Sequence, residues 1–159
     1  MYKELFKEIG RRFLSPWNHP PFLFYYILSI IVLGAIGIAG SVVEVFNNKD
    51  MHLYYISSTI GTYFITIMAV SFADLNMDNE IRYSKAMLLL SFLVLIITLG
   101  LLYLSYSLKN NYSFIPAIFG VILSHTVWVI ANSNDDKYKE KSYDRKVREE
   151  ANLKHGVKW

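Results

Sequence analysis

The sequence predicts an all-α integral membrane protein whose four membrane-spanning helices form two transmembrane hairpins. Hydrophobic residues make up 53% of the 159 residues and charged residues only 18%, below the ~25% charge that is usual in soluble domains. The charge is also unevenly placed, because 12 of the 16 Lys and Arg residues lie in 1–20 and 133–159. The nearly uncharged middle excludes an ordinary aqueous fold, and its hydrophobicity excludes a disordered chain.

An N-terminal amphipathic helix is expected before the first span. Apolar side chains recur at helical spacing from Tyr2 to Phe13, and Lys and Glu residues fill the opposite side. The pattern predicts a helix over 2–14 that Ser15-Pro16 ends, followed by a stiff proline elbow up to residue 21. We expect the region 1–21 to lie flat in the cytoplasmic interface of the membrane. The alternative is that its apolar face packs on a partner or on another subunit.

Four apolar segments follow, each close to the ~20 residues that a membrane-spanning helix needs. Polar breaks at 47–50, 74–85 and 109–111 separate them. Because the first and third breaks are short, each joins antiparallel neighbours, which gives the two hairpins. The third span, rich in Leu, Ile and Val, is expected to face lipid. Within a membrane domain over 22–131, the predicted spans are 22–46, 53–73, 86–108 and 113–131.

The orientation follows from the placement of Lys and Arg. Fourteen of these residues flank the spans on one side, whereas the two short loops on the other side carry only Lys49 and Lys109. Positive residues concentrate on the cytoplasmic side of membrane proteins, so both termini are predicted to be cytoplasmic. The first apolar run is too long for a signal-peptide core and is interpreted as a retained span. Aromatic residues suited to the two interfaces are Trp17, Tyr25 and Tyr26 on the inner side, and Tyr54, Tyr55, Tyr106 and Tyr112 on the outer side.

The segment 132–159 is predicted to be a charged cytoplasmic tail with a helix. Opposite charges four residues apart, such as Asp144 with Arg148, have the spacing of helical ion pairs. Its eight basic and six acidic residues nearly balance, which argues against direct nucleic-acid binding. The helix is either simply solvated or docks on a cytoplasmic protein. The candidate partner-binding residues are Tyr143, Val147, Arg148 and Trp159.

Few ionisable residues fall inside the spans, and such residues are functional candidates. Glu44 and Asp74 lie near span ends, where an interfacial cap or an ion pair is the structural alternative. His125 lies deeper, in the fourth span. It is either a neutral imidazole hydrogen-bonded to a neighbouring hydroxyl or a group for proton sensing, ion passage or gating.

Small and hydroxyl-bearing residues indicate where helices approach one another. Ser58, Thr62 and Thr66 share one face of the second span, which suits either helix packing or a narrow polar path. Small residues four apart let helix backbones approach closely in lipid. The candidate helix-packing residues are Gly34, Gly37, Gly40, Ser41, Gly61 and Gly120.

No constellation of catalytic residues is recognisable. The chain has no Cys, which excludes thiol nucleophiles and thiolate metal sites. Phosphate-binding, zinc-protease and serine-hydrolase motifs are absent. The four His residues fall on different segments, at 19, 52, 125 and 155. We therefore expect no enzyme activity, no cofactor and no metal.

The layout of four spans, short outer loops and cytoplasmic ends resembles that of the membrane subunit of the Kiwa anti-phage defence system. This resemblance is one of architecture and carries over no site residue. It implies an oligomer in the bacterial inner membrane that recruits a cytoplasmic, nucleic-acid-binding partner and responds to infection. The predicted function is thus a non-enzymatic oligomeric component that recruits or regulates a cytoplasmic partner. The alternatives are a pore-forming effector or channel, an immunity protein against a pore-forming toxin, and a lipid-modifying enzyme.

Overall fold

The computed structural model describes residues 2–48, 52–77 and 84–133, and the described residues are all-α. Four helical segments are long and apolar enough to cross a membrane, which indicates a multi-pass membrane protein and confirms the four predicted spans. These segments are Pro20–Asn47, Tyr54–Asn76, Ala86–Ser107 and Asn111–Asn132. The predicted tail, with Tyr143, Val147, Arg148 and Trp159, lies outside the described residues.

The first span is a composite helix of three parts: α2 (Pro20–Tyr25), a π-helical segment η2 (Tyr26–Val32) and α3 (Leu33–Asn47). Proline suits the first turn of a helix because its missing N–H would have no intrahelical partner there, and Pro20 begins α2. At the end of η2, the Leu33 N–H donates to the Leu28 carbonyl five residues back. Such wide turns are rare and are often found at functional sites. The sequence did not predict this one.

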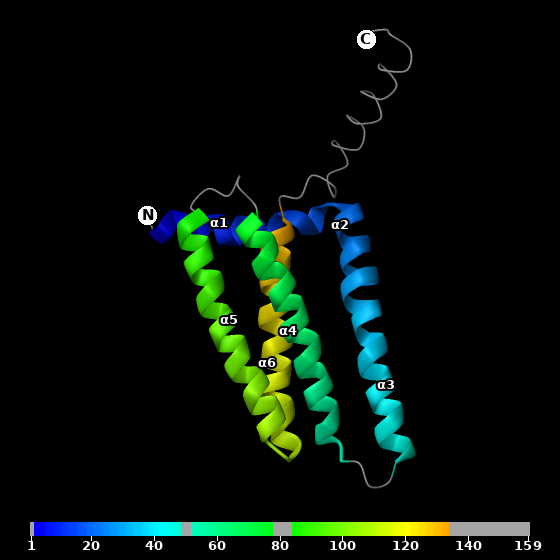
Figure 1. The fold of residues 1–159 in the computed structure, drawn as a ribbon. Helices are drawn as coiled ribbons and strands as arrows, with labels where there is room; N and C mark the ends of the chain where they lie inside the picture. The colour runs from blue at the N-terminus through cyan, green and yellow to red at the C-terminus, as the bar shows by residue number, and fades with distance from the viewer. Residues whose placement is uncertain (1, 49–51, 78–83, 134–159) are drawn as a thin grey trace, which may run out of the picture.

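The other spans are α4 (Tyr54–Met77), α5 (Ser84–Ser107) and α6 (Phe114–Asn132), the last preceded by a short 3-10 turn, η3 (Asn111–Ser113). The α3–α4 and α5–α6 connections lie at the same end of the molecule (Figure 1). α4 packs most extensively on α6 and then on α5, whereas α3 leans on α4. The described spans therefore form a three-helix core with the first span attached at its side.

Burial and hydropathy run in opposite directions among the four spans. In the most apolar part of each, the second and fourth spans are 39% and 44% buried at mean hydropathies of 1.5 and 2.0. The first and third are 6% and 17% buried, at 2.4 and 2.7. The third span was expected to face lipid, and much of it is exposed. The first span, despite its glycines, is even less buried.

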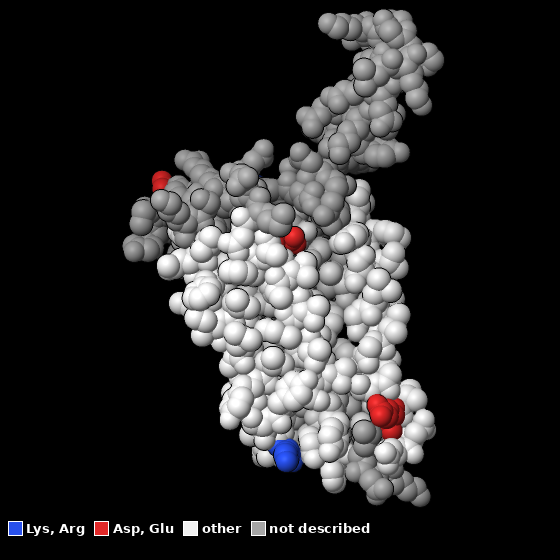
Figure 2. Space-filling view, in the orientation of Figure 1, with Lys and Arg blue, Asp and Glu red and all other residues white. Residues whose placement is uncertain are grey.

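α1 (Tyr2–Leu14) and the 3-10 turn η1 (Ser15–Asn18) lie across the end of the spans opposite the two short loops (Figure 1). Leu5 and Ile9 pack on a cluster of side chains from the core helices, so the apolar face of α1 covers the chain's own bundle. Phe6 and Leu14 stay exposed. The position fits the predicted interfacial helix, but its docking surface is intramolecular. Figure 2 shows charge only near the two ends of the face in view and none across its middle.

Candidate functional site

A cluster of polar side chains lies inside the spans, where three helices meet around His125. The two imidazole nitrogens contact two tyrosine hydroxyls: Nδ1 is 2.8 Å from Tyr26 Oη and Nε2 is 3.0 Å from Tyr63 Oη. Tyr63 in turn donates to the main-chain carbonyl of Ile30, at 2.8 Å. These contacts join the first span, α4 and α6 through a single chain of hydrogen bonds.

The direction of each bond in this chain follows from its last member. Because the Tyr63 hydroxyl donates to the Ile30 carbonyl, its oxygen accepts from the Nε2–H of His125. A neutral imidazole with a proton on Nε2 has an acceptor at Nδ1, and the Tyr26 hydroxyl donates to it. All polar hydrogens of the cluster are thereby used. The arrangement matches the hydrogen-bonded imidazole that was one of the two alternatives for His125.

A cavity of about 290 Å³ borders this cluster on the side of α1. Residues from α1, η1, η2 and α6 line it: Phe13, Trp17, Tyr26, Val121, Ile122, His125, Thr126 and Val129. Trp17 makes edge-to-face contacts with Phe13 and Tyr26, with ring centroids 6.3 and 5.2 Å apart. The aromatic elbow between α1 and the first span therefore forms one wall of the cavity.

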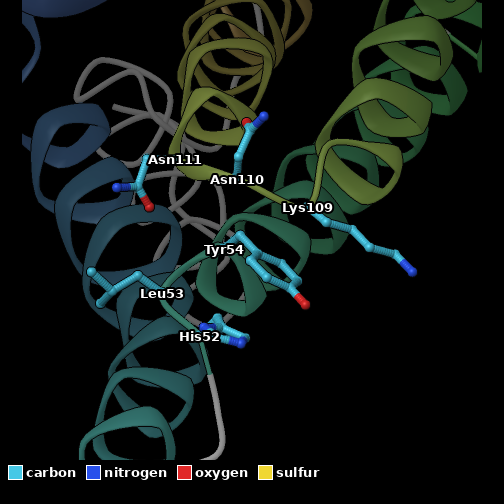
Figure 3. Close-up of a pocket in the computed structure, with 6 residues that line it drawn as sticks. All are labelled: His52, Leu53, Tyr54, Lys109, Asn110 and Asn111. Atoms are coloured by element: carbon cyan, nitrogen blue, oxygen red, sulfur yellow. The ribbon is translucent and has the colours of Figure 1, made fainter.

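A second, larger hollow of about 550 Å³ lies at the opposite end, between the two short loops (Figure 3). It is lined by His52, Leu53, Tyr54, Lys109, Asn110 and Asn111. The His52 and Tyr54 rings stack, and the Lys109 side chain points away from them (Figure 3). The Asn110 side chain accepts a hydrogen bond from the Tyr112 N–H. Its lining side chains are mostly exposed, so this hollow is an open surface and holds no convergent polar groups.

The two predicted carboxylates in the spans lie apart from the histidine cluster. Glu44 is exposed near the end of α3. Asp74 lies near the other end of α4, where the Asn132 side-chain amide makes a long contact of 3.5 Å with its carboxylate. Asn132 also donates to the Trp128 carbonyl at 3.1 Å. Asp74 thus joins a polar contact between α4 and α6, a partner that the sequence did not indicate.

The predicted hydroxyl row does not face the interior of the described bundle. Thr62 and Thr66 are exposed, and Ser58 is half-buried. Each hydroxyl donates to a carbonyl three or four residues earlier in α4, and Thr62 also contacts the Tyr106 hydroxyl at 2.9 Å. Among the described residues, the row therefore lines no path through a single chain.

The six predicted packing residues divide into two groups. Gly34 lies against the Tyr63 ring, Gly61 against Leu102 and Gly120 against Phe64. Ser41 contacts the Thr59 hydroxyl of α4 at 2.8 Å. By contrast, a Cβ at either remaining position, Gly37 or Gly40, would meet none of the described atoms within 4 Å.

Sequence reasoning missed Tyr63 altogether and placed Tyr26 only in an interfacial belt. A usable signal was present in the sequence, since Tyr63 lies near the middle of its span. A phenolic hydroxyl that far from the interface needs a hydrogen-bond partner, and His125 was the one ionisable side chain predicted at depth. The pairing of α4 with α6 was not predictable, so their contact was not either.

At the cytoplasmic end, Glu8 joins two arginines of α1. Its carboxylate accepts from Arg11 at 2.6 and 2.9 Å and from Arg12 at 3.0 Å, and the Arg12 side chain is buried. The Arg11 hydrogen bonds, with a further contribution from Arg12, lower the pKa of Glu8 to about 2. A carboxylate with a depressed pKa stabilises the fold above its unfolded-state value. That contribution is lost as the pH falls from about 4.5 towards 2.

We therefore expect the packing of α1 on the bundle to weaken over this acidic range. Hydrogen exchange of the α1 amides, measured against pH in detergent micelles, should show protection falling below about pH 4.5. Glu8→Gln should flatten this dependence, and Glu4→Gln on the same helix should preserve it. An unchanged pH profile in the Glu8→Gln variant would contradict the role of Glu8.

Among residues 2–48, 52–77 and 84–133, no three His, Cys, Asp or Glu side chains gather in a way that suits a metal ion. Comparisons with protein families, curated proteins and solved structures find no match to the chain.

Proposed function

We propose that this chain is a non-enzymatic component of the bacterial inner membrane that acts by assembly. Copies associate through the first span, with both termini in the cytoplasm, and the assembly presents the tail 133–159 to a soluble protein partner. The role in anti-phage defence that the architectural resemblance implies belongs to the same proposal. The observation that carries the proposal is the exposure of the first span.

The first span makes few contacts for a helix of its composition. Only 6% of its most apolar part is buried in the chain, yet it contains three glycines within seven residues. Glycine in a spanning helix is useful where a second backbone approaches closely. Gly34 receives such an approach from within the chain, whereas Gly37 and Gly40 are open. A second copy is the occupant that we propose for this open face.

Replacing Gly37 or Gly40 with Leu is expected to disrupt the oligomer. Each change adds bulk to the open face where the backbones of two copies would meet, a loss of ~1–3 kcal/mol for overpacking. Native mass spectrometry in detergent should then show a smaller or polydisperse species. Gly100→Leu is the matched control, because Gly100 in α5 is equally open among the described atoms. A wild-type monomer, or an oligomer that both variants preserve, would contradict assembly through this face.

Deleting residues 138–159 is expected to abolish binding of the cytoplasmic partner and to leave the oligomer intact. The deletion leaves every span in place, and the charges of the tail nearly balance, which suits a protein surface better than an anionic leaflet. Co-purification of a soluble protein from the native host should depend on the tail. If nothing soluble co-purifies with the full chain, the adaptor proposal fails. Ion flux through reconstituted liposomes would then test the pore alternative, with Ser58, Thr62, Thr66 and His125 as the first residues to change.

A further inference from the structure

The cavity beside the histidine cluster has the chemistry of a hydrocarbon site. Aromatic rings of Phe13 and Trp17 form one side, and the aliphatic side chains Val121, Ile122 and Val129 form the other. Trp17 also packs edge-on against Phe22, with ring centroids 5.9 Å apart. Because these rings support one another across α1, η1 and the first span, the wall is formed before any occupant arrives.

The polar atoms in the lining already have partners. The Tyr26 hydroxyl and the His125 ring are hydrogen-bonded at 2.8 Å, and the Thr126 hydroxyl donates to the Ile122 carbonyl at 2.8 Å. A buried water needs two to four polar partners, and a polar ligand needs groups that fix its orientation. Neither finds them here, whereas a hydrocarbon chain requires none.

The position of the cavity indicates where such a chain comes from. α1 lies across the ends of the spans (Figure 1), and the cavity lies between this helix and α6. It therefore opens just below the level of an interfacial helix, where the acyl chains of that leaflet begin. A chain seated in a recess contacts protein on more sides than one lying on a convex helix surface, and each added contact contributes dispersion energy.

We propose that this cavity binds one acyl chain of a membrane phospholipid from the leaflet beneath α1. The occupant makes its contacts with the aromatic elbow and with α6, and it fills space that the described side chains leave open. It therefore links α1 and the first span to the core helices. The proposal is independent of the oligomer and of the tail, because one chain contains every lining residue.

Photocrosslinking tests this site in the full-length protein. The protein is reconstituted in nanodiscs with a phosphatidylethanolamine that carries a diazirine on one acyl chain, and labelled peptides are mapped by mass spectrometry. Labelling is expected to concentrate on Phe13, Trp17 and the cavity side of α6, above the level at exposed apolar residues of α5. Uniform labelling of all lipid-exposed surfaces would overturn the proposal.

Two substitutions on α6 sharpen the test. Ile122→Trp fills the cavity rim, and Ile118→Trp adds the same ring one turn away, outside the lining; the native side chains are 56% and 54% exposed. Only Ile122→Trp is expected to lose the concentrated labelling and the phospholipid retained in native mass spectra. Equal thermal unfolding midpoints would show that both variants fold. If both variants retain the lipid, or both lose it, the site is refuted.

Discussion

Gly120→Ala in α6 is expected to destabilise the described bundle more than any other single methyl group added at a glycine. The new Cβ would lie 2.5 Å from Cε1 of Phe64, a ring that is fully buried in the contact between α4 and α6. Neither helix can withdraw easily, because this is the most extensive interface in the described structure. Overpacking of this kind costs ~1–3 kcal/mol and occasionally more. Reversible unfolding in mixed micelles of mild detergent and dodecyl sulfate measures the loss.

The matched control is Gly100→Ala, where the added Cβ meets no described atom within 4 Å. This variant should be neutral or slightly stabilising, because alanine is favoured over glycine in helix interiors by ~1 kcal/mol. Phe64→Leu should recover part of the loss in the Gly120→Ala background, since the two positions share one contact and their effects should not add. Strict additivity would show that the ring is not what the new methyl group meets.

Tyr63→Phe is expected to cost more stability than Tyr26→Phe, although both remove one hydroxyl. The Tyr63 hydroxyl makes two interhelical hydrogen bonds, to His125 Nε2 and to the Ile30 carbonyl, and the Tyr26 hydroxyl makes one, to His125. Interhelical hydrogen bonds in membranes average ~0.6 kcal/mol and reach ~1.7 kcal/mol. We therefore expect a loss of about 1–2 kcal/mol for Tyr63→Phe and about half of that for Tyr26→Phe. Unfolding in the same micelles gives both values.

Tyr103→Phe is the control, because this tyrosine of α5 is 70% exposed. Spin labels on exposed positions of the first span and α6, read by pulsed electron resonance, give a second measurement that a uniform loss of stability does not move. The distance distribution should broaden most in Tyr63→Phe, since only Tyr63 joins the first span both directly and through His125. A larger effect from Tyr26→Phe would reverse the proton order derived for the cluster.

The sequence predicted the spans well and their packing partners poorly. Long apolar runs determine where membrane helices lie, so the predicted 86–108 and the observed Ala86–Ser107 nearly coincide. The end of α1 at Leu14 was also predictable, because Ser15-Pro16 stops a helix. Which helices touch depends instead on the fit of individual side chains. Gly120 fits Phe64 and Gly34 fits Tyr63, and nothing in the spacing of one helix specifies the partner on another.

The histidine cluster shows the same limit at the level of a site. His125 was recognised as a candidate because an ionisable side chain at depth is rare, but its partners come from positions 99 and 62 residues away in the chain. The π-helical segment that holds both Tyr26 and Ile30 has no recognised sequence pattern, and it forms where tertiary contacts favour it. Residue chemistry therefore indicated the centre of the cluster, and only the fold supplied its surroundings.

The opposite trends of hydropathy and burial have a consequence for biosynthesis. Each hairpin leaves the ribosome with its more apolar helix first: the first span at a mean hydropathy of 2.4 before the second at 1.5, and the third at 2.7 before the fourth at 2.0. A strongly apolar helix partitions from the translocon into lipid without tertiary partners. The trailing helix, richer in hydroxyls and glycine, then meets a partner already in place. We therefore expect membrane integration to proceed in pairs, with each leading helix retaining its follower.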